Sequence, residues 1–83
     1  MKISFKLYAS LSDYLPAGTR YNRVELDVPP DASILQIIEP YGMPPKLVHL
    51  VLVNGVFIPP EQRGERTLVE NDVLAIWPPI AGG

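Results

Sequence analysis

The sequence predicts an α+β domain with a mixed sheet packed on one main helix. Three observations predict this class: segments of alternating apolar and polar residues, one helix start with a capping box, and a nearly continuous apolar run before a hairpin turn. Their order along the chain is strand, strand, helix, strand, one or two short strands, strand. The chain has 83 residues, which is enough for one small domain.

Two strands are expected in the N-terminal part of the chain. Residues 2–9 alternate, with Ile3, Phe5 and Leu7 on one side, and residues 21–28 alternate in the same way. This pattern is typical of strands with one buried face. We expect the connection between them to hold a short helical turn and to join the two strands as a hairpin.

The main helix is expected to begin after Ser33. Ser33 and Gln36 have the spacing of a capping box, and apolar residues follow at helical spacing. Pro40 lacks the N–H that would bond to the Gln36 carbonyl, so the helix should end or kink near Glu39. Gly42 then allows the chain to turn away.

The second half of the chain should complete the sheet. Residues 48–53 are almost all apolar, which predicts a central strand covered on both faces. Asn54-Gly55 is a strong hairpin signal and should return the chain in a short strand. Residues 66–69 are expected to add a short edge strand, and residues 73–77 form the last strand.

Composition and charge exclude several classes of function. The net charge is −2 and the basic residues are scattered, so no basic patch is available to neutralise nucleic-acid phosphates. The chain has no cysteine, which excludes disulfides and thiolate metal sites and suits a reducing compartment. No segment approaches the roughly 20 apolar residues of a membrane span. We therefore expect a cytoplasmic protein that binds neither nucleic acid nor membrane.

The sequence also lacks a recognisable catalytic set. His49 is the only histidine, so a metal site is not expected. The carboxylates lie singly in turns and caps, without the convergence that acid–base catalysis requires, and the glycines form no phosphate loop. We therefore expect no bound cofactor and no enzymatic activity of its own. Any chemistry should take place at the C-terminus and be performed by a partner.

The terminal Gly82-Gly83 pair is the candidate reactive site. Glycine has no Cβ, so such an arm is narrow, and a double proline stiffens its root. An arm of this kind suits the threading of a terminal carboxylate into another protein's channel. The alternative is a frayed terminus. We expect a folded domain over residues 1–78 and a flexible reactive tail over residues 79–83.

The phase of the last strand indicates a second candidate site. Leu74 and Ile76 match the buried phase, so Ala75 and Trp77 should face the opposite side. Aromatic residues are favoured anchors of protein interfaces. We therefore expect a partner-binding face formed by Trp77, Ala75 and Phe57. The alternative is that a loop covers Trp77.

Three segments resemble a known family. Residues 76–83, Ile-Trp-Pro-Pro-Ile-Ala-Gly-Gly, look like the terminus of MoaD, the small subunit of molybdopterin synthase. Residues 48–55 are similar to the central strand and turn of the MoaD/ThiS sulfur carriers, and Asn71-Asp72 matches their turn before the last strand. The resemblance implies a β-grasp, ubiquitin-like fold.

The resemblance also implies a mechanism. A MoeB/ThiF-like adenylating enzyme would use ATP to activate the Gly83 carboxylate, and a persulfide sulfur donor would then convert it to a thiocarboxylate. Gly82 would allow passage through the partner's channel, while Ile80 and Ala81 would line the approach. A MoaE-like large subunit is implied as a further partner, and the sulfur would serve molybdopterin (molybdenum or tungsten cofactor) biosynthesis.

Some features depart from MoaD and keep other readings open. Trp77 stands where phenylalanine is common, Pro40 interrupts a helix that usually runs longer, and residues 8–16 look more like ubiquitin-like domains found ahead of certain ribonuclease-type modules. The alternatives are a sulfur carrier for thiamine thiazole or another product, a ubiquitin-like protein modifier, and an inert β-grasp binding module.

Overall fold

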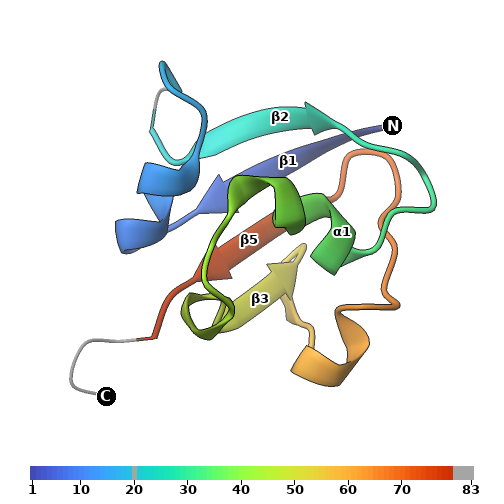
Figure 1. Cartoon of the computed structure of the whole chain (residues 1–83). Coiled ribbons are helices and arrows are strands. Elements are labelled where there is room, and N and C mark those ends of the chain that lie inside the picture. The colour runs from blue at the N-terminus through green and yellow to red at the C-terminus, as the bar shows by residue number, and fades with distance from the viewer. Residues whose placement is uncertain (20, 80–83) are drawn as a thin grey trace.

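The computed structural model describes residues 1–19 and 21–79 of the chain, and its centre is a five-stranded sheet (Figure 1). The strand order across the sheet is β2-β1-β5-β3-β4. The strands are β1 (Lys2–Leu7), β2 (Arg23–Asp27), β3 (Leu50–Val53), β4 (Val56–Phe57) and β5 (Val73–Trp77).

The pairing of β1 with β5 determines which segments leave the sheet at the same end. β1 and β5 are parallel, whereas β1–β2, β5–β3 and β3–β4 pair antiparallel. The segment after β1 and the segment after β5 therefore leave the sheet at the same end, as Figure 1 shows. The mixed sheet predicted from the sequence is confirmed.

The helix α1 (Ile34–Ile38) packs against one face of the sheet, and its predicted start is confirmed. The Gln36 N–H donates to Ser33 Oγ at 3.2 Å, and the Ser33 N–H donates to Gln36 Oε1 at 2.8 Å. At Pro40 the α-helix gives way to a 3-10 helix, η2 (Glu39–Tyr41), as expected from the missing N–H. Gly42, with φ of 71°, ends it.

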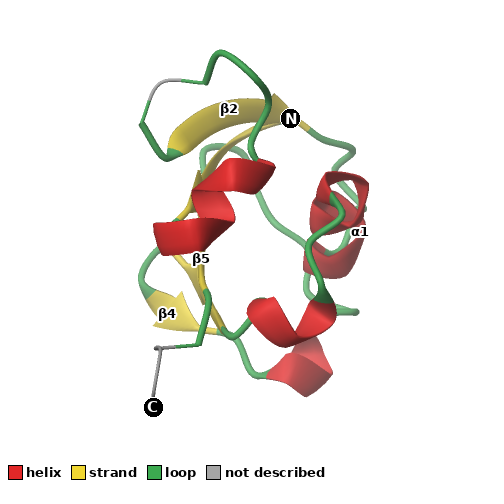
Figure 2. Cartoon of the chain, turned by 60° about the vertical axis from the view of Figure 1, so that its left-hand side comes forward, coloured by secondary structure: helices red, strands yellow, loops and turns green. Residues whose placement is uncertain are grey.

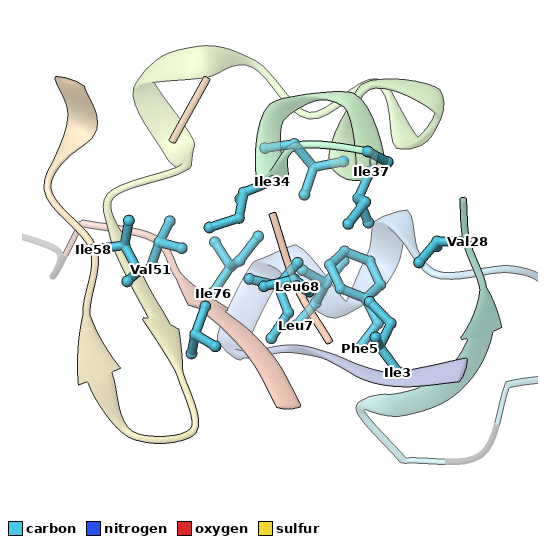
Figure 3. Close-up of a cluster of buried hydrophobic side chains, with 14 of the residues drawn as sticks. Ile3, Phe5, Leu7, Val28, Ile34, Ile37, Val51, Ile58, Leu68 and Ile76 are labelled. Atoms are coloured by element: carbon cyan, nitrogen blue, oxygen red, sulfur yellow. The ribbon is translucent and has the colours of Figure 1, made fainter. Parts of the chain in front are cut away.

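Between this face and the helix lies a single hydrophobic core, part of which is drawn in Figure 3. Phe5 and Leu7 of β1, Val51 of β3 and Ile76 of β5 are fully buried. Ile34 and Ile37 point from α1 toward the sheet. The alternation predicted for the first and last strands therefore has the correct phase.

Three further 3-10 helices connect the strands: η1 (Ala9–Tyr14), η3 (Pro45–Leu47) and η4 (Pro60–Gln62). Figure 2 shows α1 to one side of the sheet, and η1 contacts both β1 and β5. The helical turn expected between the first two strands is confirmed as η1.

Two expected strand boundaries were wrong. The first strand ends at Leu7 instead of residue 9, because Ala9 takes a left-handed φ of 52° that breaks the extended backbone. The second strand is limited to residues 23–27, because Tyr21, with φ of 62°, belongs to the preceding turn.

The expected edge strand at residues 66–69 is also absent from the described structure. Only one isolated bridge forms there, between Ser33 and Thr67, and the Ile34 N–H donates to the Arg66 carbonyl at 3.0 Å. The segment crosses the start of α1 instead of lying along a strand, so its backbone pairs with the helix cap. Leu68 is buried in the core from this position.

Candidate functional site

The face of the sheet turned away from α1 is divided into a charged half and an apolar half. Residues directly opposite each other in paired strands project to the same face. The pairing therefore defines an apolar surface over β5, β3 and β4, which we call the open-face patch. Its members are Tyr8, Leu50, Leu52, Phe57, Val73, Ala75 and Trp77.

Trp77 is held at the edge of this patch by a stacked tyrosine. The rings of Tyr8 and Trp77 lie 4.0 Å apart between centroids, with an angle of 6° between their planes. The Tyr8 N–H donates to the Ile76 carbonyl at 3.0 Å, which aligns the segment after β1 with the end of β5. Both rings remain partly exposed. The ring of Tyr8, in the connection between β1 and η1, therefore covers part of Trp77.

The expectation that residues 48–53 are covered on both faces was wrong. Val51 and Val53 are buried beneath the helical layer, but Leu50 and Leu52 are only half-buried on the open face. No helix of the described residues packs on that face, so these leucines are covered only by neighbouring side chains. The continuous apolar run thus gives the open-face patch its central residues.

The three residues proposed from sequence for partner binding share this face but differ in exposure. Phe57 is 49% exposed and Trp77 is half-buried. Ala75 is only 7% exposed, because it lies between the longer side chains of Lys6 and Leu52 on the adjacent strands. Ala75 therefore forms a shallow floor, and its neighbours supply most of the exposed surface.

Three members of the patch, Tyr8, Leu50 and Leu52, were not expected from the sequence. Leu52 could have been found from the sequence. The Asn54-Gly55 turn pairs Leu52 with Phe57, so the two side chains lie on the same face. The alternation expected over residues 2–9 also places Tyr8 on the side opposite Ile3, Phe5 and Leu7, although β1 itself ends at Leu7.

A buried arginine supports the edge of the patch from the helical side. The Arg63 guanidinium lies 5.9 Å from the centre of the Phe57 ring and is almost fully buried. Burial lowers the pKa of Arg63, and the nearby Glu61 carboxylate opposes this to a smaller degree. The guanidinium donates to three backbone carbonyls: Ile58 at 2.9 Å, Val48 at 3.2 Å and His49 at 3.1 Å.

The open-face patch leads directly into the C-terminal segment. Pro78 is half-buried and Pro79 is exposed, directly after the Trp77 that stacks on Tyr8. The remaining residues proposed from sequence lie outside the described structure, and their roles stay predictions: Ile80, Ala81, Gly82 and Gly83.

Other parts of the described chain offer less chemistry. His49 is exposed, and no three metal-ligating side chains come together among the described residues. A groove of about 520 Å³ lies between β2 and α1, and its lining is mostly apolar but includes Asp27, Asp31 and Gln36. It lies on the helical side of the sheet, whereas the tail root adjoins the open-face patch. Over the residues that the structure describes, no helix has the length and apolar character needed to span a bilayer.

A mixed five-stranded sheet with two parallel central strands and one helix across it defines a β-grasp, ubiquitin-like protein. The family described as Mut7-C ubiquitin matches residues 1–81, so this chain belongs to that family. It is a MoaD/ThiS-like ubiquitin-fold protein, as the resemblance of its sequence to the MoaD/ThiS sulfur carriers implied. No curated protein matches the chain.

Solved structures of similar proteins come from Haloferax volcanii. The crystal structure of SAMP1 is 26% identical over the whole of both chains, with a TM-score of 0.67. A crystal structure of small archaeal modifier protein 1 is also 26% identical, covering 95% of this chain and 98% of that one, with a TM-score of 0.68. The solution structure of the HVO 2177 protein is 19% identical over 100% of this chain and 87% of that chain, with a TM-score of 0.69, and shows the fold alone.

Proposed function

We propose that this chain is a sulfur carrier whose Gly83, where it bears the terminal carboxylate, is adenylated and converted to a thiocarboxylate. The sulfur would be donated in molybdopterin biosynthesis, in the cytoplasm. The activating partner is an adenylating enzyme of the MoeB/ThiF type, which uses ATP, so the carrier binds no cofactor of its own. A MoaE-like large subunit would receive the charged carrier.

One observation carries this proposal: a double proline directly follows a partly exposed apolar patch, and a Gly-Gly sequence lies two residues further along the chain. The patch provides a surface on which a partner can dock, since contiguous exposed apolar surface marks interaction sites. The patch ends at Trp77, and the six residues from Pro78 to Gly83 can span at most about 22 Å. A docked partner could therefore hold the carrier while its active site reaches Gly83.

The chemistry requires a better leaving group on the Gly83 carbonyl. The carboxylate attacks the α-phosphate of ATP, pyrophosphate leaves, and an acyl-adenylate forms. The terminal sulfur of a persulfide then attacks the acyl carbon and displaces AMP, giving an acyl disulfide. A second thiol reduces that disulfide and releases the thiocarboxylate. Gly82 has no Cβ and would let the arm enter a narrow active site.

A second candidate function is a ubiquitin-like protein modifier. It is favoured by the 26% identity to a protein described as a small archaeal modifier. The first step is the same, because an isopeptide bond also requires an activated Gly83 carbonyl. The two functions differ in the nucleophile: a persulfide sulfur for the carrier, a lysine amine of another protein for the modifier.

The test combines the purified chain with ATP, a MoeB/ThiF-type enzyme and a persulfide donor. The intact mass of the natural protein should first be measured to establish that it ends at Gly83. We then expect a mass gain corresponding to one oxygen-to-sulfur exchange, and its absence with a panel of such enzymes would refute the carrier. Adducts to lysines of other proteins would instead support the modifier.

A matched pair of glycine variants locates the reaction. Gly82→Ala should slow the exchange strongly, because a Cβ widens the arm. Gly64→Ala is the control: an added Cβ there meets only Leu35 Cδ1 at 3.5 Å, an ordinary contact. This control should react like the wild type, and equal rates for both variants would contradict the proposed route of the tail.

A further inference from the structure

The longer free edge of the described sheet belongs to β2. The strand order places β2 at one side of the sheet, and the strand at the other side, β4, has only two residues. An edge strand offers a row of unpaired N–H and C=O groups to another chain. The edge of β2 is therefore the place where a further strand can extend the sheet.

The bonds between β1 and β2 determine which backbone groups face outward. The Leu7 N–H donates to the Asn22 carbonyl at 3.0 Å, so Asn22 and every second residue after it bond to β1. The residues between them direct their N–H and C=O groups away from the sheet: Arg23, Glu25 and Asp27. None of these backbone groups has a hydrogen-bond partner within residues 1–19 and 21–79. Three bonding positions are thus open to a second strand.

The side chains at these positions form a self-complementary charge pattern. When two antiparallel β2 strands are centred on Glu25, Arg23 of each copy lies directly opposite Asp27 of the other. Opposite charges at such positions stabilise a strand pair, and two-fold symmetry provides two of these pairs. On the other face Val24 lies opposite Leu26. Both side chains are only partly buried against the core, so the pairing would cover more of their apolar surface.

Other antiparallel registers match less well. A pairing centred on Val24 places Arg23 opposite Glu25 but aligns only two of the three outward positions. A pairing centred on Leu26 places Glu25 opposite Asp27, and like charges there are destabilising. The register centred on Glu25 uses all three positions, and its one unfavourable contact is Glu25 opposite its own copy.

Arg23 and Asp27 can form the pair without losing their present contacts. The Asp27 side chain is 79% exposed, and the Met1 ammonium contacts its Oδ1 atom at 3.2 Å. Arg23 is exposed, and its Nη2 donates to Ser4 Oγ at 2.8 Å. A guanidinium carries five N–H donors, so others remain for a carboxylate. Asp27 likewise has a second carboxylate oxygen.

We propose that this chain forms a weak two-fold dimer in which the two β2 strands pair antiparallel, centred on Glu25. The two sheets then continue into each other, with both open-face patches on the same side. The groove between β2 and α1 includes Leu26 in its lining, so Val24 of the second copy covers part of it. Pro78 and Pro79 follow β5, which β1 separates from this edge, so the dimer leaves them uncovered. This inference goes beyond the proposed function and does not depend on it.

A single cysteine at residue 25 tests the register directly. The chain has no cysteine, so Glu25→Cys adds one thiol per copy. In the proposed dimer the Cα atoms of the two residues are about 5.5 Å apart, which is within the range of a disulfide. Under a mild oxidant this variant should form a covalent dimer, measured by non-reducing electrophoresis and by intact mass.

Asp27→Cys and Glu65→Cys are the matched controls, since each also replaces one acidic side chain with a thiol. The two residues at position 27 are about 14 Å apart in the dimer, and Glu65 is exposed after η4, outside β2. After correction for the reactivity of each thiol toward iodoacetamide, Glu25→Cys should crosslink at least about tenfold faster than either control. Equal rates for Glu25→Cys and Glu65→Cys would overturn the inference, and so would faster crosslinking of Asp27→Cys than of Glu25→Cys.

Two charge reversals test the pairs between the copies without a disulfide. Arg23→Glu places two acidic side chains opposite each other, and Asp27→Lys places two cations there. Each variant alone should therefore dimerise about tenfold more weakly than the wild type. A mixture of the two variants brings opposite charges together at both positions and should restore association, measured by sedimentation velocity. A mixture that associates no better than either variant alone would contradict the pairing.

Glu25→Gln distinguishes a weak dimer from none. It removes the like charges at the centre of the interface, so the dissociation constant should fall about threefold. Wild-type dissociation is expected on the order of 1 mM, because each copy contributes one short strand. If the wild type and Glu25→Gln both sediment as monomers at about 1 mM, the inference is overturned. None of these measurements needs an adenylating enzyme, so their outcome is independent of the proposed function.

Discussion

The two faces of the sheet use the same strands for different purposes. On the helical face, every large side chain of β1 and β5 is buried in one core (Figure 3). On the other face, β1 and β2 carry mostly charged and polar residues, whereas β5, β3 and β4 carry the apolar patch. Burial against α1 can account for folding without that patch. Apolar residues of the open face are therefore left partly uncovered next to Pro78 and Pro79.

The largest predicted effect compares one substitution on the two faces. Leu74 is fully buried on β5, and Leu52 is half-buried on the adjacent β3. Leu74→Ala should lower the free energy of unfolding by about 3 kcal/mol, because it leaves a cavity in the core. Leu52→Ala should lower it by about 1 kcal/mol, because its side chain is already partly in water. Urea unfolding would measure both values.

The same pair should behave in the opposite way toward the adenylating partner. Leu52→Ala removes part of the surface proposed to contact the partner. The kcat/KM for adenylation should therefore fall although the variant remains folded. At a temperature where it remains folded, Leu74→Ala should be activated normally. Equal losses of stability for both variants would show that the open face is as well packed as the core and would remove the basis for the docking surface.

A smaller effect should follow from removing the Arg63 guanidinium, which joins two backbone segments beside the open-face patch. Arg63 holds the start of β3 to the segment after β4 through its bonds to three backbone carbonyls. Arg63→Met fills similar space but leaves those carbonyls without a donor, so the free energy of unfolding should fall by about 2 kcal/mol. Relative to the wild type, the substitution should increase the rate of amide hydrogen exchange more in β3 and β4 than in β1 and β2.

Arg66→Met is the control for this prediction. Arg66 is exposed, and its side chain donates only to the adjacent Thr67 carbonyl, at 3.1 Å. Its replacement should change stability little. If Arg63→Met were as stable as Arg66→Met, the carbonyls would have found other donors and Arg63 would not hold the hairpin in place.

Local patterns were enough to predict most of the fold. The capping box at Ser33 and the break at Pro40 depend on neighbouring residues only, and both are present. The hairpin at Asn54-Gly55 is also present, with left-handed φ values of 51° and 83°. The edge strand expected at residues 66–69 failed because its backbone pairs with a helix cap that is distant in sequence.

The candidate site was less predictable, for a physical reason. A continuous apolar strand has the same pattern whether it is buried on both faces or offers one face to a partner, so Leu50 and Leu52 were assigned to the core. The contacts of Arg63 with carbonyls 14 and 15 residues earlier depend on tertiary structure. Trp77 was found because β5 alternates clearly, but its stacking on Tyr8 depends on the parallel pairing of β1 with β5, which joins segments distant in sequence.

The smallest predicted effect concerns the helical face at high pH. Burial raises the pKa of the Tyr41 hydroxyl above its ordinary value of 10.0, and its ring packs 5.0 Å from that of Phe5. The folded state therefore holds this proton more tightly than the unfolded state does.

The contribution of this group to the free energy of unfolding is fully present below pH 10. It is lost as the pH rises through the folded-state pKa, because the unfolded chain ionises first. Tyr41→Phe should therefore lose less stability than the wild type above pH 10, while the two profiles run parallel between pH 7 and 9. Urea midpoints measured across this range would decide, and parallel profiles above pH 10 as well would mean that Tyr41 is hydrated in the folded protein and that the helical layer is open at this point.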